Sequence, residues 1–408
     1  MDQIQQAEIV VFWTGFGLVL FSYAVYPVAI WWLARAFARY ESHPDVSSDQ
    51  LPSLSILIVA HNEEEVIKDR VSNALATDYP TDRSEVVVAL DGCTDGTLSI
   101  LQGFRSDRLR VLSFETRQGK SETLNHAFES LSGEIVVLSD ANTEFDPGAA
   151  RRLARWFADP EVGIVCGRLV LSDPMTGRNV DSLYWKYETF LKRCEGSLGA
   201  LLGANGAIYA IRRKLFSPIP GSTLIDDFVV PLLAKLRSGC RIVYEPTAVA
   251  YEETPAEVAS EFRRRARIGA GGFQSIAILW RLLDPRRGWV AFSFLGHKVL
   301  RWLCPFFLLG MLASNLFLLG SPTYRLALGL QCAFYGLSVL VAYLPRSWTF
   351  ARPWRLTTMF TMMNAALFVG FWRWLLGTNR GTWARTSRSP RPHAIDANRE
   401  FFRSTQWR

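Results

Sequence analysis

The sequence predicts an α/β protein with a mainly parallel sheet, flanked by transmembrane and interfacial α-helices. Short apolar runs rich in β-branched residues alternate with segments of helical periodicity between about residues 50 and 285. An uncharged stretch, residues 9–34, precedes this region, and apolar segments return beyond Asp284. The 408 residues are enough for more than one domain, at about 150 residues per domain.

The first predicted element is a retained membrane anchor within residues 1–40. Residues 9–34 carry no charge and are long enough to cross about 30 Å of hydrocarbon as a helix. Arg35 and Arg39 follow, which favours a cytosolic position for this end of the helix. A cleaved signal peptide fits less well, because the apolar core is too long and no basic residue precedes it.

Strands and helices alternate in the central region, residues 50–285. Five short apolar runs are predicted strands: "LSILIVA", "EVVVAL", "LRVLSF", "GEIVVLSD" and "VGIVCGRL". Segments with apolar residues at three- and four-residue spacing lie between them, such as residues 64–76 and 120–131. This succession favours right-handed crossovers and a mainly parallel sheet covered on both faces, with ligands at the carboxyl ends of the strands.

Apolar segments within residues 290–378 predict two or three further membrane crossings. These segments are residues 292–319, 326–344 and 356–376. The first contains His297, Lys298 and Arg301, so its front half is expected to lie along the membrane interface. Three crossings after one anchor would place the arginine-rich tail, residues 379–408, outside, against the positive-inside tendency, so the number of crossings stays open.

The net charge and the spacing of the cysteines limit which partners and which cellular compartment are expected. The net charge is +7, and much of the excess comes from arginines beside apolar segments, which favours a membrane surface or an anionic substrate. No recognisable nucleic-acid motif accompanies this charge, so no nucleic-acid partner is expected. The six cysteines are scattered without a CxxC pair, which is typical of a reducing cytosol and predicts neither a disulfide framework nor a zinc site.

Three of the predicted strands end in polar side chains. The first is followed by Asn62 and Glu63, the second ends at Asp91 and the fourth at Asp140. Carboxyl ends of neighbouring parallel strands share one edge, so these side chains are expected to converge. Asp140 and Asn142 offer oxygen ligands of the kind that Mg²⁺ or Mn²⁺ prefers. The alternative for each motif is a turn followed by a helix cap.

Later motifs complete the candidate site. Asp226 and Asp227 begin an amphipathic segment, where the helix dipole alone favours acids; the functional alternative is that one of them removes a proton from an acceptor hydroxyl. The glycine-rich stretch from Gly203, which includes Asn205, favours a close approach to a ligand, although a tight turn explains it too. The arginines of "EFRRRARIG", Arg267 among them, suit lipid head groups or a pyrophosphate.

Together and in this order, the motifs resemble the membrane-embedded family-2 glycosyltransferases with a GT-A fold. That group includes the cellulose, chitin, hyaluronan and poly-N-acetylglucosamine synthases. The resemblance covers about residues 54–274 and implies a cytosolic, Rossmann-like GT-A domain within residues 50–285. It also implies an inverting hexosyl- or N-acetylhexosaminyltransferase, with a nucleotide-diphosphate sugar as donor and a UDP-sugar as the leading expectation.

The resemblance assigns the nucleotide-binding residues. "VAHNEEE" looks like the family's nucleotide-binding opening, with Asn62 and Glu63 near the uridine. "DGCTDGT" supplies Asp91 for the base and ribose region. "RQGKSETLN" is similar to the family's Gly-Lys segment, which implies that Lys120 lies near the nucleotide.

The resemblance also assigns the metal ligands and the catalytic general base. "SDAN" stands at the place of the DxD metal motif, so Asp140 is implied to bind the metal or the diphosphate, and Asn142 is a departure. The implied cofactor is Mg²⁺ or Mn²⁺. "IDD" stands where Thr-Glu-Asp is usual, so Asp227 is the implied general base and Asp226 replaces the glutamate.

The QxxRW motif of processive synthases is imperfect here. With its arginine aligned on Arg267, Arg264 stands at the glutamine and Ile268 at the tryptophan that normally floors the acceptor site. The tail "GTNRGTWARTSR" is similar to the gating segment of those synthases. It implies three residues beside the active site: Trp383, Thr386 and Arg388.

Three functions are consistent with the sequence. The first is a synthase that extends an exopolysaccharide, and the second is a transferase that adds one sugar to a polyprenyl phosphate or lipid-linked oligosaccharide. The third is a catalytically silent membrane scaffold of a polysaccharide secretion complex. The expected setting is the bacterial inner membrane with a cytosolic catalytic domain, and the expected partners are the donor, the acceptor, membrane lipids and subunits of a secretion complex.

Overall fold

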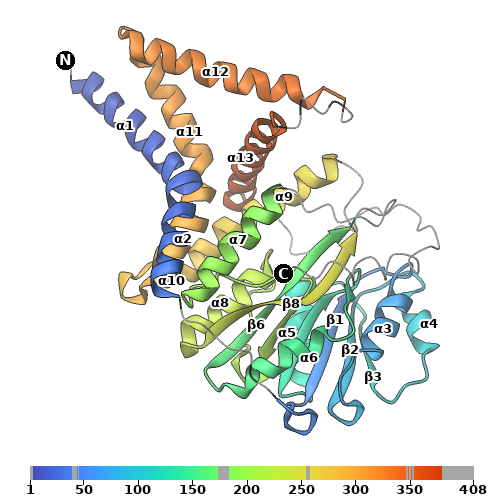
Figure 1. The fold of residues 1–408 in the computed structure, drawn as a ribbon. Coiled ribbons are helices and arrows are strands. Elements are labelled where there is room, and N and C mark those ends of the chain that lie inside the picture. The colour runs from blue at the N-terminus through green and yellow to red at the C-terminus, as the bar shows by residue number, and fades with distance from the viewer. Residues whose placement is uncertain are drawn as a thin grey trace. The chain divides into compact units, whose positions relative to one another are not determined.

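The chain forms two compact units in its computed structural model, which describes residues 3–38, 44, 46–172, 183–253, 258–345, 348, 351 and 353–378. The helical unit contains the described residues up to Phe37 and from Val258 onward. The sheet unit contains the described residues between them. The positions of the two units relative to one another are not determined (Figure 1).

The sheet unit is built on an eight-stranded mixed sheet in the order β3-β2-β1-β4-β7-β6-β8-β5 (Figure 1). The strands are β1 Leu54–Ala60, β2 Ser84–Asp91, β3 Leu109–Phe114, β4 Ile135–Asp140, β5 Glu144–Phe145, β6 Val162–Ser172, β7 Tyr209–Arg212 and β8 Arg241–Glu253. All five predicted strands form, as β1 to β4 and β6. The sequence did not predict β5, β7 and β8.

Most strand pairs are parallel. β1 pairs with β2 and β4, β2 pairs with β3, and β6 pairs with β8, all in parallel. β7 runs antiparallel to both β4 and β6, and β5 runs antiparallel to β8. Every residue of β1 is buried, because both faces of a parallel sheet are covered, and this explains its unbroken apolar run.

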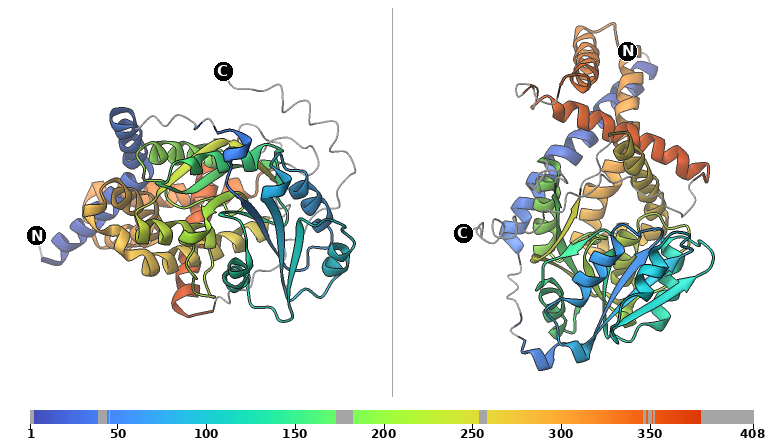
Figure 2. Two further views of the ribbon diagram at one scale, coloured as in Figure 1. Left: turned by 90° about the horizontal axis from the view of Figure 1, so that it is seen from below. Right: turned by 90° about the vertical axis from the view of Figure 1, so that its right-hand side faces the viewer.

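Helices lie on both faces of the sheet (Figure 2). The helices of this unit are α3 Ile67–Leu75, α4 Thr97–Gln102, α5 Lys120–Ser130, α6 Ala149–Ala154, α7 Leu183–Ser197 and α8 Asp226–Ser238. Apolar residues of α3 and α6 form one core with Ile56, Ile58 and Val137 of the sheet. On the other face, the first residues of α5 and α8 lie beside Leu57 and Leu138. Successive side chains of β1 and β4 thus pack alternately against the helices on one face of the sheet and those on the other.

The helical unit contains two long helical stretches, Gln3–Phe37 and Trp289–Phe317, and each includes a π-helical turn. Its elements are α1 Gln3–Leu20, the π-helix Phe21–Val25, α2 Tyr26–Phe37, α9 Val258–Leu279, α10 Trp289–Ser293, the π-helix Phe294–Val299, α11 Leu300–Phe317, α12 Pro322–Ala342 and α13 Arg355–Leu375. Within the described residues, three helical stretches are long and apolar enough to cross a membrane: Gln3–Phe37, Trp289–Phe317 and Pro322–Ala342. They include the predicted N-terminal anchor and two of the three C-terminal segments.

Candidate active site

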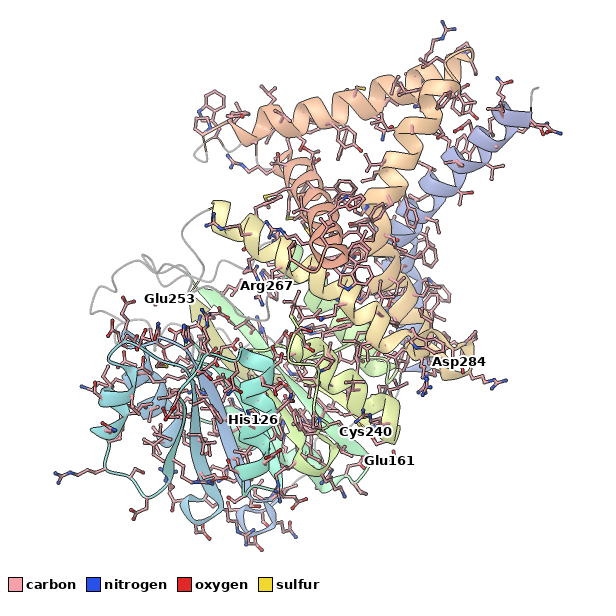
Figure 3. All side chains as sticks on the ribbon, turned by 180° about the vertical axis from the view of Figure 1, so that it is seen from behind. His126, Glu161, Cys240, Glu253, Arg267 and Asp284 are labelled. Atoms are coloured by element: carbon pink, nitrogen blue, oxygen red, sulfur yellow. The ribbon has the colours of Figure 1, made fainter. Side chains whose placement is uncertain are left out.

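The carboxyl edge of the parallel strands gathers the predicted acids around one lysine. The Lys120 Nζ atom, at the start of α5, lies 2.8 Å from Asp140 Oδ1 at the end of β4. The same Nζ atom lies 3.3 Å from Asp226 Oδ2 at the start of α8. Figure 3 labels Glu253 at this edge of the sheet and Cys240 at the opposite edge, one at each end of β8. A strand end and two helix starts therefore build the cluster.

Lys120 is the counter-ion of this edge. Burial alone would lower the pKa of its ammonium group, but the carboxylates of Asp140 and Asp226 outweigh burial and hold the pKa above its usual range. The lysine is therefore cationic at every physiological pH. Gly119, which precedes it, has a φ of 97°, a conformation that glycine adopts without strain.

Asp91 holds the turn that presents Lys120. Its side chain is fully buried, and its carboxylate accepts hydrogen bonds from the Gln118 amide at 2.6 Å and the Gly119 amide at 3.0 Å. Both amides belong to the turn between β3 and α5. This is a structural role at the predicted edge, and a contact of Asp91 with the base or ribose stays a prediction.

Replacement of Asp91 by alanine is expected to destabilise the protein by about 2 kcal/mol, since it leaves the buried Gly119 amide unpaired and removes the acceptor of the part-buried Gln118 amide. Thermal unfolding of the full chain in detergent micelles would measure this as a lower Tm. Asp107→Ala is the control, because Asp107 is exposed and surface changes stay within about 0.5 kcal/mol. Equal Tm values for the two variants would mean that the buried hydrogen bonds contribute nothing.

The glycine-rich loop before β7 binds the first turn of α8. The Ala204 amide donates to the Asp227 carbonyl at 2.9 Å, and the Gly206 amide donates to Asp227 Oδ2 at 3.0 Å. Pro231 lies four residues after Asp227 inside α8 and has no N–H, so the Asp227 carbonyl lacks its usual helical donor. The amide of Ala204 takes that place, and the loop thereby fixes the position of the Asp227 carboxylate.

Gly203 and Asn205, both in the stretch predicted to approach a ligand, determine the path of this loop. Gly203 has a φ of +77°, and a Cβ atom on it would lie 2.8 Å from Cδ2 of Phe228, so the close approach requires glycine. The Asn205 side chain donates from Nδ2 to the Gly167 carbonyl at 2.6 Å, and its Oδ1 accepts from Lys192 of α7. Lys192 was not predicted, because a single lysine on an amphipathic helix has the pattern of a solvent-exposed residue.

The surroundings of Asp227 shift the pKa of its carboxyl group toward neutral pH. Burial, followed by the neighbouring Asp226 carboxylate, raises the pKa of Asp227 to about 6. Asp140 also raises this pKa, whereas Lys120 and Lys192 lower it. A carboxylate with a pKa near the working pH is both deprotonated and basic enough to accept a proton, which is the property of a general base.

Asn62 and Glu63 join two loops at the same edge. Asn62 has a φ of 55°, and its side-chain oxygen accepts from the Thr94 amide at 2.8 Å. The Glu63 amide donates to the Thr97 hydroxyl at 2.9 Å, and the Glu63 side chain is buried. These bonds tie the loop after β1 to the loop after β2. Contacts of the two residues with a nucleotide stay predictions.

Asn142 is paired with a residue that the sequence did not predict, Glu252 of β8. Its Nδ2 atom donates to Glu252 Oε1 at 3.0 Å, so its Oδ1 is the atom that can serve as a ligand. Asp140 and Asn142 thus offer hard oxygen donors that fit Mg²⁺ or Mn²⁺. No group of three or more His, Cys, Asp or Glu side chains among the described residues could hold a cation. A cation here would complete its coordination with phosphate oxygens.

Arg264 and Arg267 lie on α9, in the helical unit. Arg264 donates from Nε and Nη2 to the two carboxylate oxygens of Glu261, at 2.8 and 3.0 Å. The acidic cluster belongs to the sheet unit, so a contact of either arginine with a diphosphate stays a prediction. The three predicted gating residues lie outside the described residues: Trp383, Thr386 and Arg388.

Most of the sheet unit matches a known family. Residues 55–217 match the sequence profile of Glycosyl transferase family 2. The chain carries a family 2 glycosyl transferase domain.

Two curated relatives are similar to this chain over most of its length. The chain is 25% identical over 283 residues to the poly-beta-1,6-N-acetyl-D-glucosamine synthase of Staphylococcus aureus, covering 64% of this chain and 66% of that protein. The enzyme of the same name from Staphylococcus epidermidis is 25% identical over 238 residues, covering 55% of this chain and 56% of that protein. The matched region thus spans just under two thirds of the S. aureus relative.

The fold of this chain resembles that of a solved enzyme. Mannosyltransferase PcManGT from Pyrobaculum calidifontis, in complex with GDP-Man and Mn²⁺, superposes with a TM-score of 0.69 at 22% sequence identity. The likeness covers 92% of this chain and 99% of that chain. It confirms the predicted GT-A type of fold, and the profile match confirms the family that the motifs indicated.

Proposed function

We propose that this protein transfers a hexosyl or N-acetylhexosaminyl group from a nucleotide-diphosphate sugar, with UDP-sugars first among the donors. The acceptor is a growing exopolysaccharide or a lipid-linked saccharide at the cytosolic face of the bacterial inner membrane. One observation carries the proposal: Asp140, Asp226 and Asp227 gather around Lys120 at the ligand-binding edge of the sheet. The names of the staphylococcal relatives and the three apolar helices support it.

The geometry suits a single displacement. Asp227 accepts the proton of the acceptor hydroxyl, whose oxygen forms a bond to C1 of the donor sugar. The bond from C1 to the diphosphate oxygen breaks, its electron pair stays with the nucleoside diphosphate, and the configuration at C1 inverts. Lys120 neutralises charge on the departing diphosphate, and we assign the same role to Arg267. Alignment of the acceptor and the donor supplies much of the remaining rate.

Asp140 and Asn142 would hold the divalent cation at this site. When bound, Mg²⁺ or Mn²⁺ supplies positive charge to the diphosphate. The Mn²⁺ in the complex of PcManGT supports a requirement for a divalent cation here. The Asp140 side chain is 32% exposed, so the edge is open to an incoming cation and nucleotide.

A donor screen tests the proposal. The full chain, purified and reconstituted in lipid, would be given several nucleotide sugars with Mg²⁺ or Mn²⁺, and nucleotide release and product length would be measured. Nucleotide release with a ladder or a long polymer supports a synthase. An absence of release with every donor would contradict the enzymatic function and favour a silent scaffold of a secretion complex.

A second candidate function is the addition of one sugar to a polyprenyl phosphate or a lipid-linked oligosaccharide. It is favoured by Ile268, which stands where processive synthases carry the tryptophan beneath the acceptor. The same screen separates the two functions, because a product with one added sugar excludes a processive synthase.

The pKa of Asp227 predicts the pH dependence of transfer. Below about pH 6 its carboxyl group is protonated and accepts no proton, so kcat/KM is expected to rise with pH through about 6. Lys192→Met removes a cation that lowers this pKa and should move the midpoint to higher pH. Lys186→Met is the control, since Lys186 is exposed on the same helix α7. An unmoved midpoint for Lys192→Met would contradict the assignment of the base.

A further inference from the structure

Tyr209, the first residue of β7, carries a fully buried hydroxyl group. Its side chain is 0% exposed, and its Oη atom makes no hydrogen bond within the part of the chain that the structure describes. Buried polar groups in proteins are nearly always paired, because an unpaired one loses its hydration without replacement. An unpaired hydroxyl beside an active site therefore points to a partner that becomes available in another state of the protein.

The strand register places the Tyr209 ring under the acidic cluster. Tyr209 lies opposite Leu138 of the antiparallel neighbour β4, and paired residues point to the same face of a sheet. Asp140 is two residues beyond Leu138 on β4, so it shares that face. Lys120 and Asp226 line one small void together with Leu138. The Tyr209 side chain therefore lies on the face that α5 and α8 cover.

The surroundings of the hydroxyl keep it a hydrogen-bond donor. Burial, and then the carboxylates of Asp226, Asp227 and Asp140, raise the pKa of the Tyr209 phenol well above its usual value. Those carboxylates are the natural acceptors for such a donor. In the state described here, Lys120 bridges two of them and the Gly206 amide binds the third.

We propose that Tyr209 is a positioning residue that donates its hydroxyl hydrogen bond to Asp226 when a bound diphosphate draws Lys120 away. The Lys120 contact with Asp226, at 3.3 Å, is longer than the contact with Asp140, at 2.8 Å, so it is the one that a diphosphate breaks first. The tyrosine hydroxyl then replaces the lost ion pair with a hydrogen bond and holds Asp226 in place beside the base Asp227. This inference rests on the proposed function.

Two tyrosine-to-phenylalanine variants of the full chain in detergent test it. Tyr209→Phe removes the unpartnered hydroxyl. Tyr79→Phe is the matched control, because the Tyr79 ring is also buried but its hydroxyl donates to the Pro52 carbonyl, before the start of β1, at 2.5 Å. Tm would be measured for each protein alone and with UDP or GDP plus Mn²⁺, and kcat and KM would be measured for nucleotide release.

The two variants are expected to behave in opposite ways. Tyr209→Phe should unfold at the wild-type Tm or above it, whereas Tyr79→Phe should unfold at a lower Tm. The nucleotide should raise the Tm of Tyr209→Phe less than that of the wild type. The kcat of Tyr209→Phe should fall about tenfold or more, as expected for a lost hydrogen bond to a charged group, while Tyr79→Phe keeps the wild-type kcat.

A third comparison shows whether Tyr209 acts through Asp226. In an Asp226→Asn background, Tyr209→Phe should reduce kcat no further, because the acceptor that it serves has lost its charge. A fully additive loss overturns the proposal. It is also overturned if Tyr209→Phe lowers the Tm of the free protein as Tyr79→Phe does, or if its kcat and its nucleotide-induced Tm increase equal those of the wild type.

The wild type separates this inference from the function on which it rests. If neither nucleotide raises the wild-type Tm and no donor releases nucleotide, the proposed function fails and the inference fails with it. If the wild type responds to the nucleotide and Tyr209→Phe responds equally, the inference alone fails.

Discussion

Replacing Asp227 by asparagine is expected to slow nucleotide release by at least about 100-fold with the true donor, the lower range for the loss of a general base. Asparagine has the same shape, and its oxygen still accepts the hydrogen bond of the Gly206 amide, which lies 3.0 Å from Asp227 Oδ2. The glycine-rich loop should therefore stay bound to α8. Only the capacity to accept a proton is lost, so kcat should fall while the Tm stays near that of the wild type.

Asp159→Asn is the matched control for this substitution. The Asp159 carboxylate also accepts a hydrogen bond from a backbone amide, that of Glu161, at 2.8 Å. Figure 3 labels Glu161 at the edge of the sheet opposite to Glu253, so the control lies away from the acidic cluster. Turnover at the wild-type rate in Asp227→Asn would refute the assignment of the base, whereas a loss in both variants would point to a general effect of the substitution on folding.

Asp140→Ala is the second substitution with a large expected effect, a reduction of kcat by about 100- to 1,000-fold. The alanine removes the nearer carboxylate of Lys120 and one of the two proposed ligands of the cation. A higher concentration of Mn²⁺ should therefore be needed for half-maximal release. Nucleotide release over a titration of Mn²⁺ would measure both effects, and Lys120 keeps Asp226 as its partner, so the fold should persist.

Asp146→Ala is the control for the second substitution. Asp146 directly follows β5 and forms an ion pair with Arg152 at 2.7 Å, but it belongs to neither the acidic cluster nor the proposed metal ligands. It should keep the wild-type kcat and the wild-type response to Mn²⁺. An Asp140→Ala protein with the same kcat and the same half-saturating Mn²⁺ concentration would exclude the proposed role of Asp140.

The predictable part of the fold is the part where local pattern and tertiary position agree. β1 to β4 and β6 are apolar runs because helices cover both of their faces, and this burial is visible in the sequence. β7 has only four residues, and the glycine-rich loop before it hides its start. Pro246 interrupts β8 where its pairing with β6 shifts register, so no regular alternation marks that strand.

The candidate site divides in the same way. Asp140, Asp226 and Asp227 could be grouped because acids at strand ends and helix starts are conspicuous in an apolar context. Glu252 and Tyr209 could not be assigned to the site from the sequence. A glutamate near the end of a strand is ordinarily a solvent-exposed residue, and an aromatic residue in an apolar run is ordinarily part of the core. One local signal for the docked loop is present in the sequence: Pro231 stands four residues after Asp227 and predicts a helical carbonyl in need of another donor.

β7 also constrains the order in which the chain can fold during synthesis. β1 to β4 can pair with one another as soon as they emerge, since each has a parallel neighbour among the four. β6, with 11 residues, has only β7 and β8 as partners among the described strands, and both are made later. Until β7, Tyr209–Arg212, has been synthesised, β6 is therefore an apolar strand with unpaired edges. Slow translation between β6 and β7 would prolong that interval, and the yield of folded protein should depend on it.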